Sequence, residues 1–173
     1  KRVLELKPGL YEAELNLGVL LLRDRQAGEA LVYLDAAAAK KPKEFRPNFY
    51  LAEALASQGR FAEAEPRYVA ALAADPKSAA AESGLGRTLA KQNRLPEAEP
   101  HYRRAAELDA AYRDALLELA SLFEAAKRPA DAIAIYRQFP ENAGVRERLG
   151  ELQLEAGQPE QAAANLEAAV AKS

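Results

Sequence analysis

The sequence predicts an all-α fold, a solenoid built from antiparallel helix hairpins. Two sets of identical residues recur at intervals of 34. One is Leu17, Leu51, Leu85 and Leu119, and the other is Ala30, Ala64, Ala98 and Ala132. A third set at the same spacing is bulky: Leu34, Tyr68, Tyr102 and Tyr136. A period of this length is typical of solenoids, in which each unit contacts only its neighbours. We therefore expect one elongated domain over residues 1–173, with a long surface in place of a single deep pocket.

The period divides the chain into five repeats, preceded by one short additional segment. The repeats are expected at 11–44, 45–78, 79–112, 113–142 and 143–173, and residues 1–10 are expected to be the tail of a preceding repeat. Terminal repeats of solenoids ordinarily carry a polar cap. Here the last helix would leave Leu166 and Val170 partly exposed, so we interpret the chain as a fragment of a larger protein.

Each repeat is expected to contain two helices, helix A and helix B, separated by polar breaks. The equivalent first break is occupied by Arg25, Gly59, Asn93, Lys127 and Gly157. Glycine and asparagine readily take the left-handed conformation that ends a helix. Pro42 and Pro76 mark the second break. Because loops of a few residues force neighbouring helices to be antiparallel, each repeat is predicted to be a helix hairpin.

The sizes of the recurring residues indicate how the two helices meet. A small residue follows the helix A leucine in every repeat: Gly18, Ala52, Gly86, Ala120 and Gly150. Helix B carries the recurring alanine and, one turn later, the bulky residue Leu34, Tyr68, Tyr102, Tyr136 or Leu166. A larger residue in place of the small one would overlap its neighbour at a cost of about 1 to 3 kcal/mol. We expect the bulky side chain to fill the gap that the small residues leave.

Two prolines fall inside the segments expected to form helix B. Pro66 and Pro100 occupy equivalent places in successive repeats. A proline in the middle of a helix costs roughly 3 kcal/mol, whereas in the first turn its missing N–H has no intrahelical partner to lose. We therefore place the starts of these two helices near Ala62 and Pro96.

The fourth repeat is shorter than the others and should differ at its end. We expect Pro140 to end its helix B early, and Asn142-Ala143-Gly144 to form a tight connection. A loss of about one helical turn, at 1.5 Å per residue, would change the local geometry. We predict a change in superhelical twist between the fourth and fifth hairpins.

The pattern resembles the tetratricopeptide repeat. The family motif of Leu-Gly, a later Ala, an aromatic residue and a closing Pro is matched by Leu17-Gly18, Ala30, Leu34 and Pro42, and by Leu85-Gly86, Ala98 and Tyr102. The family's large aromatic residue near the start of helix A is replaced by Glu14, Asn48, Glu82, Leu116 and Arg146, which should weaken packing between hairpins. The resemblance implies a right-handed superhelix, A helices that line its concave face, and a non-catalytic scaffold for protein interactions.

Composition excludes several other functions. The formal net charge is −2 with acidic and basic residues interspersed, so the chain lacks the basic field that nucleic acid or an anionic membrane needs. The longest aliphatic run, Val19 to Leu22, is far below the roughly 20 residues that span a bilayer. The absence of cysteine fits the cytoplasm and the periplasm equally well. The compartment stays open.

The inventory of reactive side chains predicts neither an enzyme nor a cofactor or metal site. The chain has no cysteine and one histidine, so the usual zinc sites and nucleophile systems have almost nothing to draw on. His101 precedes Tyr102 in helix B and is expected to be a solvent-facing structural residue. We expect no catalytic, cofactor-binding or metal-binding residues.

The resemblance places the candidate partner-binding residues on the A helices. We expect a groove contributed by Asn16, Arg46, Phe49, Tyr50, Arg87, Lys91, Glu118 and Glu151. The neighbouring positions Leu15, Val19, Ser83 and Gly84 are expected to face the same groove. The first three repeats are net positive on this face and the last two net negative. A partner with a carboxylate near Arg87 and basic residues toward the C-terminal repeats would be complementary.

Three alternatives stay open at this stage. The candidate groove residues could be only the solvated faces of five helices, because charges on exposed helices need no special explanation. The ends of the array, residues 1–10 and 159–172, could stack between copies of the chain. The array could also serve an enzyme whose catalytic domain lies outside this chain.

Overall fold

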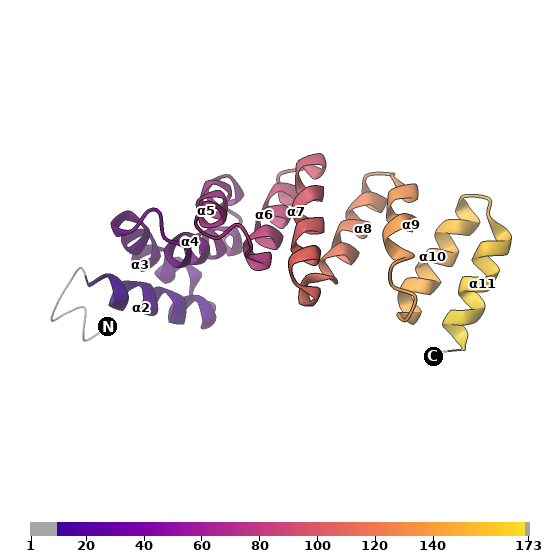
Figure 1. The fold of residues 1–173 in the computed structure, drawn as a ribbon, viewed down its shortest axis with the longest axis horizontal. Helices are drawn as coiled ribbons and strands as arrows, with labels where there is room; N and C mark the ends of the chain where they lie inside the picture. The colour runs from indigo at the N-terminus through magenta and orange to yellow at the C-terminus, as the bar shows by residue number, and fades with distance from the viewer. Residues whose placement is uncertain (1–9, 172–173) are drawn as a thin grey trace. The chain divides into compact units, whose positions relative to one another are not determined.

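The computed structural model describes residues 10–171, and the helices in this part of the chain account for the predicted fold class (Figure 1). The helices are α2 (Tyr11–Arg23), α3 (Ala27–Lys40), α4 (Phe45–Ser57), α5 (Phe61–Ala74), α6 (Ala79–Lys91), α7 (Leu95–Leu108), the short 3₁₀ helix η1 (Ala110–Tyr112), α8 (Ala115–Ala125), α9 (Pro129–Tyr136), α10 (Ala143–Glu155) and α11 (Pro159–Val170). No strand occurs between residues 10 and 171. The all-α prediction is confirmed.

The helices belong to two compact units, and the boundary between them in the sequence falls between Tyr112 and Arg113. In the first unit α2 pairs with α3, α4 with α5, and α6 with α7, while α3 also packs on α4 and α5 on α6. In the second unit α8 pairs with α9, α10 pairs with α11, and α9 packs on α10. These pairs form helix hairpins within residues 11–171. The tail predicted over residues 1–10 lies outside the described residues apart from Leu10, and the single array over 1–173 stays a prediction.

The turn between the two helices of each hairpin has the same backbone in all five repeats. The five predicted break residues all have positive φ: Arg25 (60°), Gly59 (71°), Asn93 (61°), Lys127 (57°) and Gly157 (70°). In the first hairpin Arg25 N–H donates to the Leu22 carbonyl at 3.1 Å and Gln26 N–H to the Leu21 carbonyl at 2.8 Å. This pair of bonds is the Schellman motif, which satisfies helix carbonyls that would otherwise lack donors. The turn therefore ends helix A and starts helix B within a few residues.

Small residues of helix A accept the bulky residues of helix B, as predicted. A Cβ added to Gly18 would lie 2.6 Å from Cγ of Leu34, and one added to Gly150 would lie 2.7 Å from Cγ of Leu166. At Gly86 the added atom would be 3.2 Å from the Tyr102 ring. The first two contacts are shorter than real Cβ contacts and the third is tighter than most of them, so the spacing of the helices depends on small residues at these positions.

The helices begin at Phe61 and Leu95, within one residue of the starts predicted near Ala62 and Pro96. The Schellman turn sets these starts, because its last residue is also the N-cap of the following helix. The backbone geometry of the turn, and not the proline, therefore decides where helix B begins.

The consequence is that Pro66 and Pro100 lie inside their helices and not in the first turn. The ladder of α5 has already begun, since Ala64 N–H donates to the Arg60 carbonyl at 3.0 Å. Pro66 has no N–H, so the carbonyl of Ala62 loses its regular donor. Both prolines are exposed, which places the interruption on the solvent side of each helix.

The short fourth repeat ends differently from the prediction. Its helix B, α9, has 8 residues against 14 in α3, and it ends at Tyr136, well before Pro140. Phe139 then turns inward and is buried, with the Arg113 guanidinium 4.8 Å from its ring centroid. Burial of this ring holds the segment after α9 against the unit. The twist change between the fourth and fifth hairpins stays a prediction.

The connection predicted over Asn142-Ala143-Gly144 is also different. Asn142 is the N-cap of α10, and its Oδ1 accepts a hydrogen bond from Val145 N–H at 3.1 Å. Ala143 and Gly144 are the first residues of that helix. An asparagine side chain that satisfies a free N–H of the first turn favours helix initiation over a tight turn.

Replacement of the central leucine tests the packing. Leu85 is 3% exposed, so Leu85→Ala should lower the free energy of unfolding by about 2 to 5 kcal/mol through lost burial and an unfilled cavity. Urea denaturation followed by circular dichroism measures this change. Leu20→Ala, at a position 56% exposed, is the control and should change stability by less than about 0.5 kcal/mol. Equal stabilities of the two variants would contradict the packing scheme.

Candidate functional site

A cleft of about 260 Å³ lies between α4, α5 and α6 of the first unit. Its lining residues are Glu53, Ala56, Ser57, Phe61, Tyr68, Gly84, Arg87, Thr88 and Lys91. Two of the eight predicted groove residues, Arg87 and Lys91, are among them. They stand one turn apart on α6, and both side chains are exposed. The structure thus brings two cations to one wall of the cleft.

Tyr68 is the residue around which this cleft is built. It is 2% exposed, and its hydroxyl donates a short hydrogen bond to Oε1 of Glu53. Phe49 contacts the Tyr68 ring edge-on, with centroids 6.2 Å apart, and Phe45 stacks on Phe49 at 5.2 Å. A side chain at position 84 would overlap the Tyr68 ring, so Gly84 is what allows α6 to approach it. The sequence analysis assigned Tyr68 to the core and did not identify its polar end.

The electrostatics of the cleft keep Tyr68 protonated. Burial raises the pKa of its phenol well above the usual value, and the carboxylate of Glu53 raises the pKa further. The positive charge of Arg87 acts in the opposite direction on the same pKa. Glu53 is therefore engaged by a neutral hydroxyl donor, while Arg87 and Lys91 supply positive charge.

Three positions expected to face the groove belong instead to the interior. These residues are Leu15, Val19 and Ser83, and all are buried, whereas Gly84 is buried but lines the cleft. Each lies on the side of helix A that packs against a neighbouring helix, so helical spacing alone assigned them to the wrong face. The predicted groove therefore contains fewer residues of helix A than its helical spacing suggested.

The other predicted residues of the first unit lie outside this cleft. Arg46 is exposed at the start of α4. Its positive charge acts to lower the pKa of Tyr11, which burial and the hydrogen bond that the Tyr11 hydroxyl donates to Glu44 at 2.8 Å raise. Tyr50 is half-buried and edge-on to Phe49, with centroids 5.3 Å apart. Asn16 is exposed on α2.

The two acidic candidates lie in the second unit. Glu118 is half-buried on α8, and Glu151 is exposed on α10. Glu151 accepts a hydrogen bond from Nη1 of Arg148 at 2.6 Å. The same guanidinium also donates to Glu124, so Arg148 partly neutralises the acidic surface that the sequence predicted.

His101 is not the solvent-facing residue predicted from the sequence. Its Nδ1 lies 2.6 Å from Oε2 of Glu82, and the side chain is half-buried between α6 and α7. Glu82 occupies the position of the missing family aromatic. In the preceding repeat Asn48 occupies it, fully buried, and donates to the carbonyls of Pro42 and Glu44, both at 2.8 Å. Hydrogen bonds therefore replace aromatic packing at these positions, which the sequence analysis did not predict.

Two features are absent from residues 10–171. No group of three or more histidine, cysteine, aspartate or glutamate side chains there could hold a metal ion. Within the same residues every helix is too short or too polar to cross a bilayer.

Comparison with known proteins identifies the repeats. The family model described as Tetratricopeptide repeat matches residues 15–79, 49–113 and 84–145, which together cover most of the chain. The chain belongs to the tetratricopeptide repeat family. No curated protein sequence matches it.

Solved structures of other tetratricopeptide repeat proteins share the fold. A MamA protein superposes with a TM-score of 0.80 at 17% identity, covering 94% of this chain and 91% of that one. YrrB, described as a TPR protein with an unusual peptide-binding site, gives 0.77 at 19% identity over 99% and 91% of the two chains. PilF of Pseudomonas aeruginosa gives 0.70 at 20% identity over 94% and 76%. At these identities the likeness shows the fold alone, that of a helical repeat solenoid.

The tyrosine at the centre of the cleft makes a prediction about alkaline pH. The pKa of Tyr68 is higher in the folded state than the ordinary value of about 10, so its contribution to stability is complete below pH 10 and is lost as the pH rises through the folded-state pKa. Tyr68→Phe removes this dependence. We expect the difference in unfolding free energy between parent and variant, measured in urea, to shrink steadily above pH 10. A difference that stays constant across that range would contradict the assignment.

Proposed function

We propose that this tetratricopeptide repeat chain is a non-catalytic adaptor that docks an extended segment of another protein in the cleft between α4, α5 and α6. The observation that carries the proposal is the pairing of Arg87 and Lys91 on one wall with the apolar surface of Phe61 and Ala56 in the same cleft. A cation pair beside an apolar surface suits a segment that carries a carboxylate next to an apolar side chain.

The polarity of the cleft decides which partner charge is favoured. The one carboxylate in the lining, Glu53, is half-buried and accepts the Tyr68 hydroxyl. Positive charge on exposed side chains therefore dominates the surface that a partner meets. An acidic side chain or a terminal carboxylate is complementary to it, and a basic segment is repelled.

The remaining predicted residues extend this proposal along the A helices. Asn16, Arg46, Phe49 and Tyr50 are proposed as further contacts in the first unit. Glu118 and Glu151 of the second unit are proposed as contacts for basic residues of a partner. YrrB, whose description names a peptide-binding site, is a precedent for peptide binding on this fold.

The direct test uses peptides selected on the purified chain from a random display library and then measured by fluorescence anisotropy. Selected sequences should be enriched in acidic residues. Combined replacement Arg87→Gln and Lys91→Gln should weaken their binding by about 10- to 100-fold, because each cation loses a charge-assisted hydrogen bond. Lys77→Gln, an exposed loop position outside the cleft, is the matched control and should leave the affinity unchanged. Equal affinity of the double variant and the parent would remove the cleft assignment.

A second function, self-association, is favoured by one specific observation. A cleft of about 400 Å³ on α10 and α11 is lined by Ala143, Gly144, Leu166, Ala169 and Val170 with Glu147 as its one charged residue, and Val170 is 76% exposed. An apolar face of this kind suits the packing of a further helix, such as one from a second copy of the chain. In sedimentation velocity, Val170→Asp should dissociate the resulting dimer, whereas a parent that stays monomeric at all concentrations leaves this function without support.

A further inference from the structure

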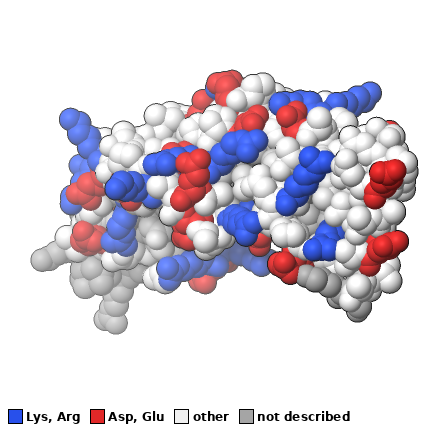
Figure 2. All heavy atoms as spheres, turned by 45° about the vertical axis from the view of Figure 1, so that its right-hand side comes forward, with Lys and Arg blue, Asp and Glu red and all other residues white. Residues whose placement is uncertain are grey.

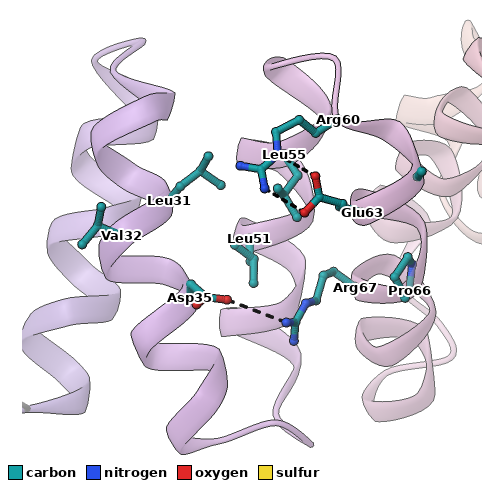
Figure 3. A pocket seen from close by; sticks show the side chains of 10 residues that line it. Leu31, Val32, Asp35, Leu51, Leu55, Arg60, Glu63, Pro66 and Arg67 are labelled. Carbon is teal, nitrogen blue, oxygen red and sulfur yellow. Dashed lines mark hydrogen bonds and ion pairs between the residues drawn. The ribbon is translucent and has the colours of Figure 1, made fainter.

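A larger cleft, of about 720 Å³, lies on a different face of α4 from the one described above (Figure 3). Its floor is formed by Leu51 and Leu55 of α4, and its walls by α3 and α5. Arg60 and Glu63 form an ion pair at one end of the cleft, and Arg67 and Asp35 form another at the opposite end. The centre is apolar and the two ends are charged.

The ion pair of Arg60 with Glu63 recurs one repeat later, and the comparison shows what the cleft between α3, α4 and α5 lacks. Arg94 stands 34 residues after Arg60 and makes the same bidentate contact with an acidic residue three positions on, Nε to Oε1 at 2.7 Å and Nη2 to Oε2 at 2.6 Å of Glu97. Its remaining nitrogen, Nη1, donates to Oε2 of Glu65 at 2.6 Å. One arginine at this position therefore binds two carboxylates, one from its own helix and one from the helix across the cleft.

In the cleft between α3, α4 and α5, the sequence has no residue that could supply this second carboxylate to Arg60. Arg60 donates from Nε and Nη2 to Glu63 at 2.8 and 2.7 Å. Position 31, which stands 34 residues before Glu65, is a leucine and offers no acceptor. Within residues 10–171 no hydrogen bond from Nη1 of Arg60 occurs, and the side chain is 45% exposed.

The ion pair at the other end does not close the cleft. The shortest distance between Arg67 and Asp35 is 3.7 Å, and the Asp35 side chain is 69% exposed. Exposed pairs with this separation contribute little to stability, so a ligand carboxylate can compete with Asp35 for the guanidinium. Two arginines thus border an apolar floor. Arg60 keeps one nitrogen without a hydrogen bond within residues 10–171, and Arg67 has only a long contact with Asp35.

We propose that the cleft between α3, α4 and α5 is a second docking site, which takes a protein segment carrying one acidic and one aliphatic side chain. The carboxylate accepts from Nη1 of Arg60, as Glu65 does from Arg94 one repeat later, and the aliphatic side chain packs on Leu31, Leu51 and Leu55. A segment without a carboxylate leaves Arg60 unsatisfied beneath it, and a basic segment meets two arginines. This site is independent of the cleft that holds Arg87 and Lys91.

The repeat itself supplies the variant that tests the proposal. Leu31→Glu places in this cleft the carboxylate that Glu65 supplies to Arg94 one repeat later. Nη1 of Arg60 should then be engaged within the chain, and an added ligand should be excluded. Position 65 shows that the fold accommodates a glutamate there. Arg60→Gln removes the donor instead. Leu20→Glu, which adds the same charge at an exposed position of α2, is the matched control.

The probe is a set of acetylated and amidated peptides that carry one Glu and one Leu at varied spacing, with a second set in which Gln replaces Glu. Binding is followed by methyl NMR of Leu31, Leu51 and Leu55. We expect saturable shifts at these methyls with the Glu peptides and at least about tenfold weaker binding with the Gln peptides. Arg60→Gln and Leu31→Glu should each weaken binding about tenfold, as judged from the methyls of Leu51 and Leu55.

The control variants separate this site from the first one. Leu20→Glu should bind like the parent, and so should the double variant Arg87→Gln and Lys91→Gln, whatever its effect on the other cleft. Shifts absent from these methyls with every Glu peptide would overturn the proposal, as would unchanged affinity in Leu31→Glu or Arg60→Gln. Shifts that appear with chain concentration alone would also overturn it, because the occupant would then be a second copy of the chain.

Discussion

The contact between a small residue of helix A and a bulky residue of helix B is the constraint on which the rest of the structure depends. Gly18 faces Leu34 and Gly150 faces Leu166 so closely that an added Cβ would force a shift, and Gly86 faces Tyr102 across a tight contact. Leu51, Leu85 and Leu119 of helix A and the recurring alanines of helix B are buried in the same hairpins. The hairpins of the first unit therefore share one pattern of turn and packing and differ in the side chains on their outer faces, whereas α9 of the fourth repeat is also shorter.

The proposed binding sites lie where the repeats differ. Gly84 lets α6 approach the Tyr68 ring, whose hydroxyl engages Glu53 at the edge of one cleft. In the other cleft, Leu31 stands where the next repeat has Glu65, and the internal salt bridge of Arg94 has no counterpart at Arg60. The donor left at Arg60 is the one that the proposed ligand of this cleft engages.

Periodicity predicted the parts of the fold that depend on local conformation and residue size. The left-handed positions, including the non-glycine residues Arg25, Asn93 and Lys127, and the small-to-bulky contacts recur in every repeat, so one sequence contains several copies of the same evidence. The helix B prolines were placed wrongly because the Schellman turn, which the sequence shows only as one residue, sets the helix start.

The candidate site was predicted less completely than the fold. Arg87 and Lys91 were identified, but Leu15 and Ser83 were assigned to the groove although they are buried, since helical spacing does not show how much of helix A the neighbouring hairpin covers. The contacts of Tyr68 with Glu53 and of His101 with Glu82 join residues 15 and 19 positions apart, on different helices. Only the three-dimensional packing brings these pairs together.

A comparison of two glycines in the same unit tests the central constraint most directly. Gly28, in α3, has open space around its Cα, whereas Gly86 faces Tyr102 and the Ala98 carbonyl. Leucine at position 28 should leave the unfolding free energy unchanged or raise it by up to about 1 kcal/mol, because leucine favours helix over glycine. Leucine at position 86 should lower it, to give a difference of at least about 2 kcal/mol between the two variants in urea denaturation. Equal stabilities of Gly28→Leu and Gly86→Leu would contradict the account.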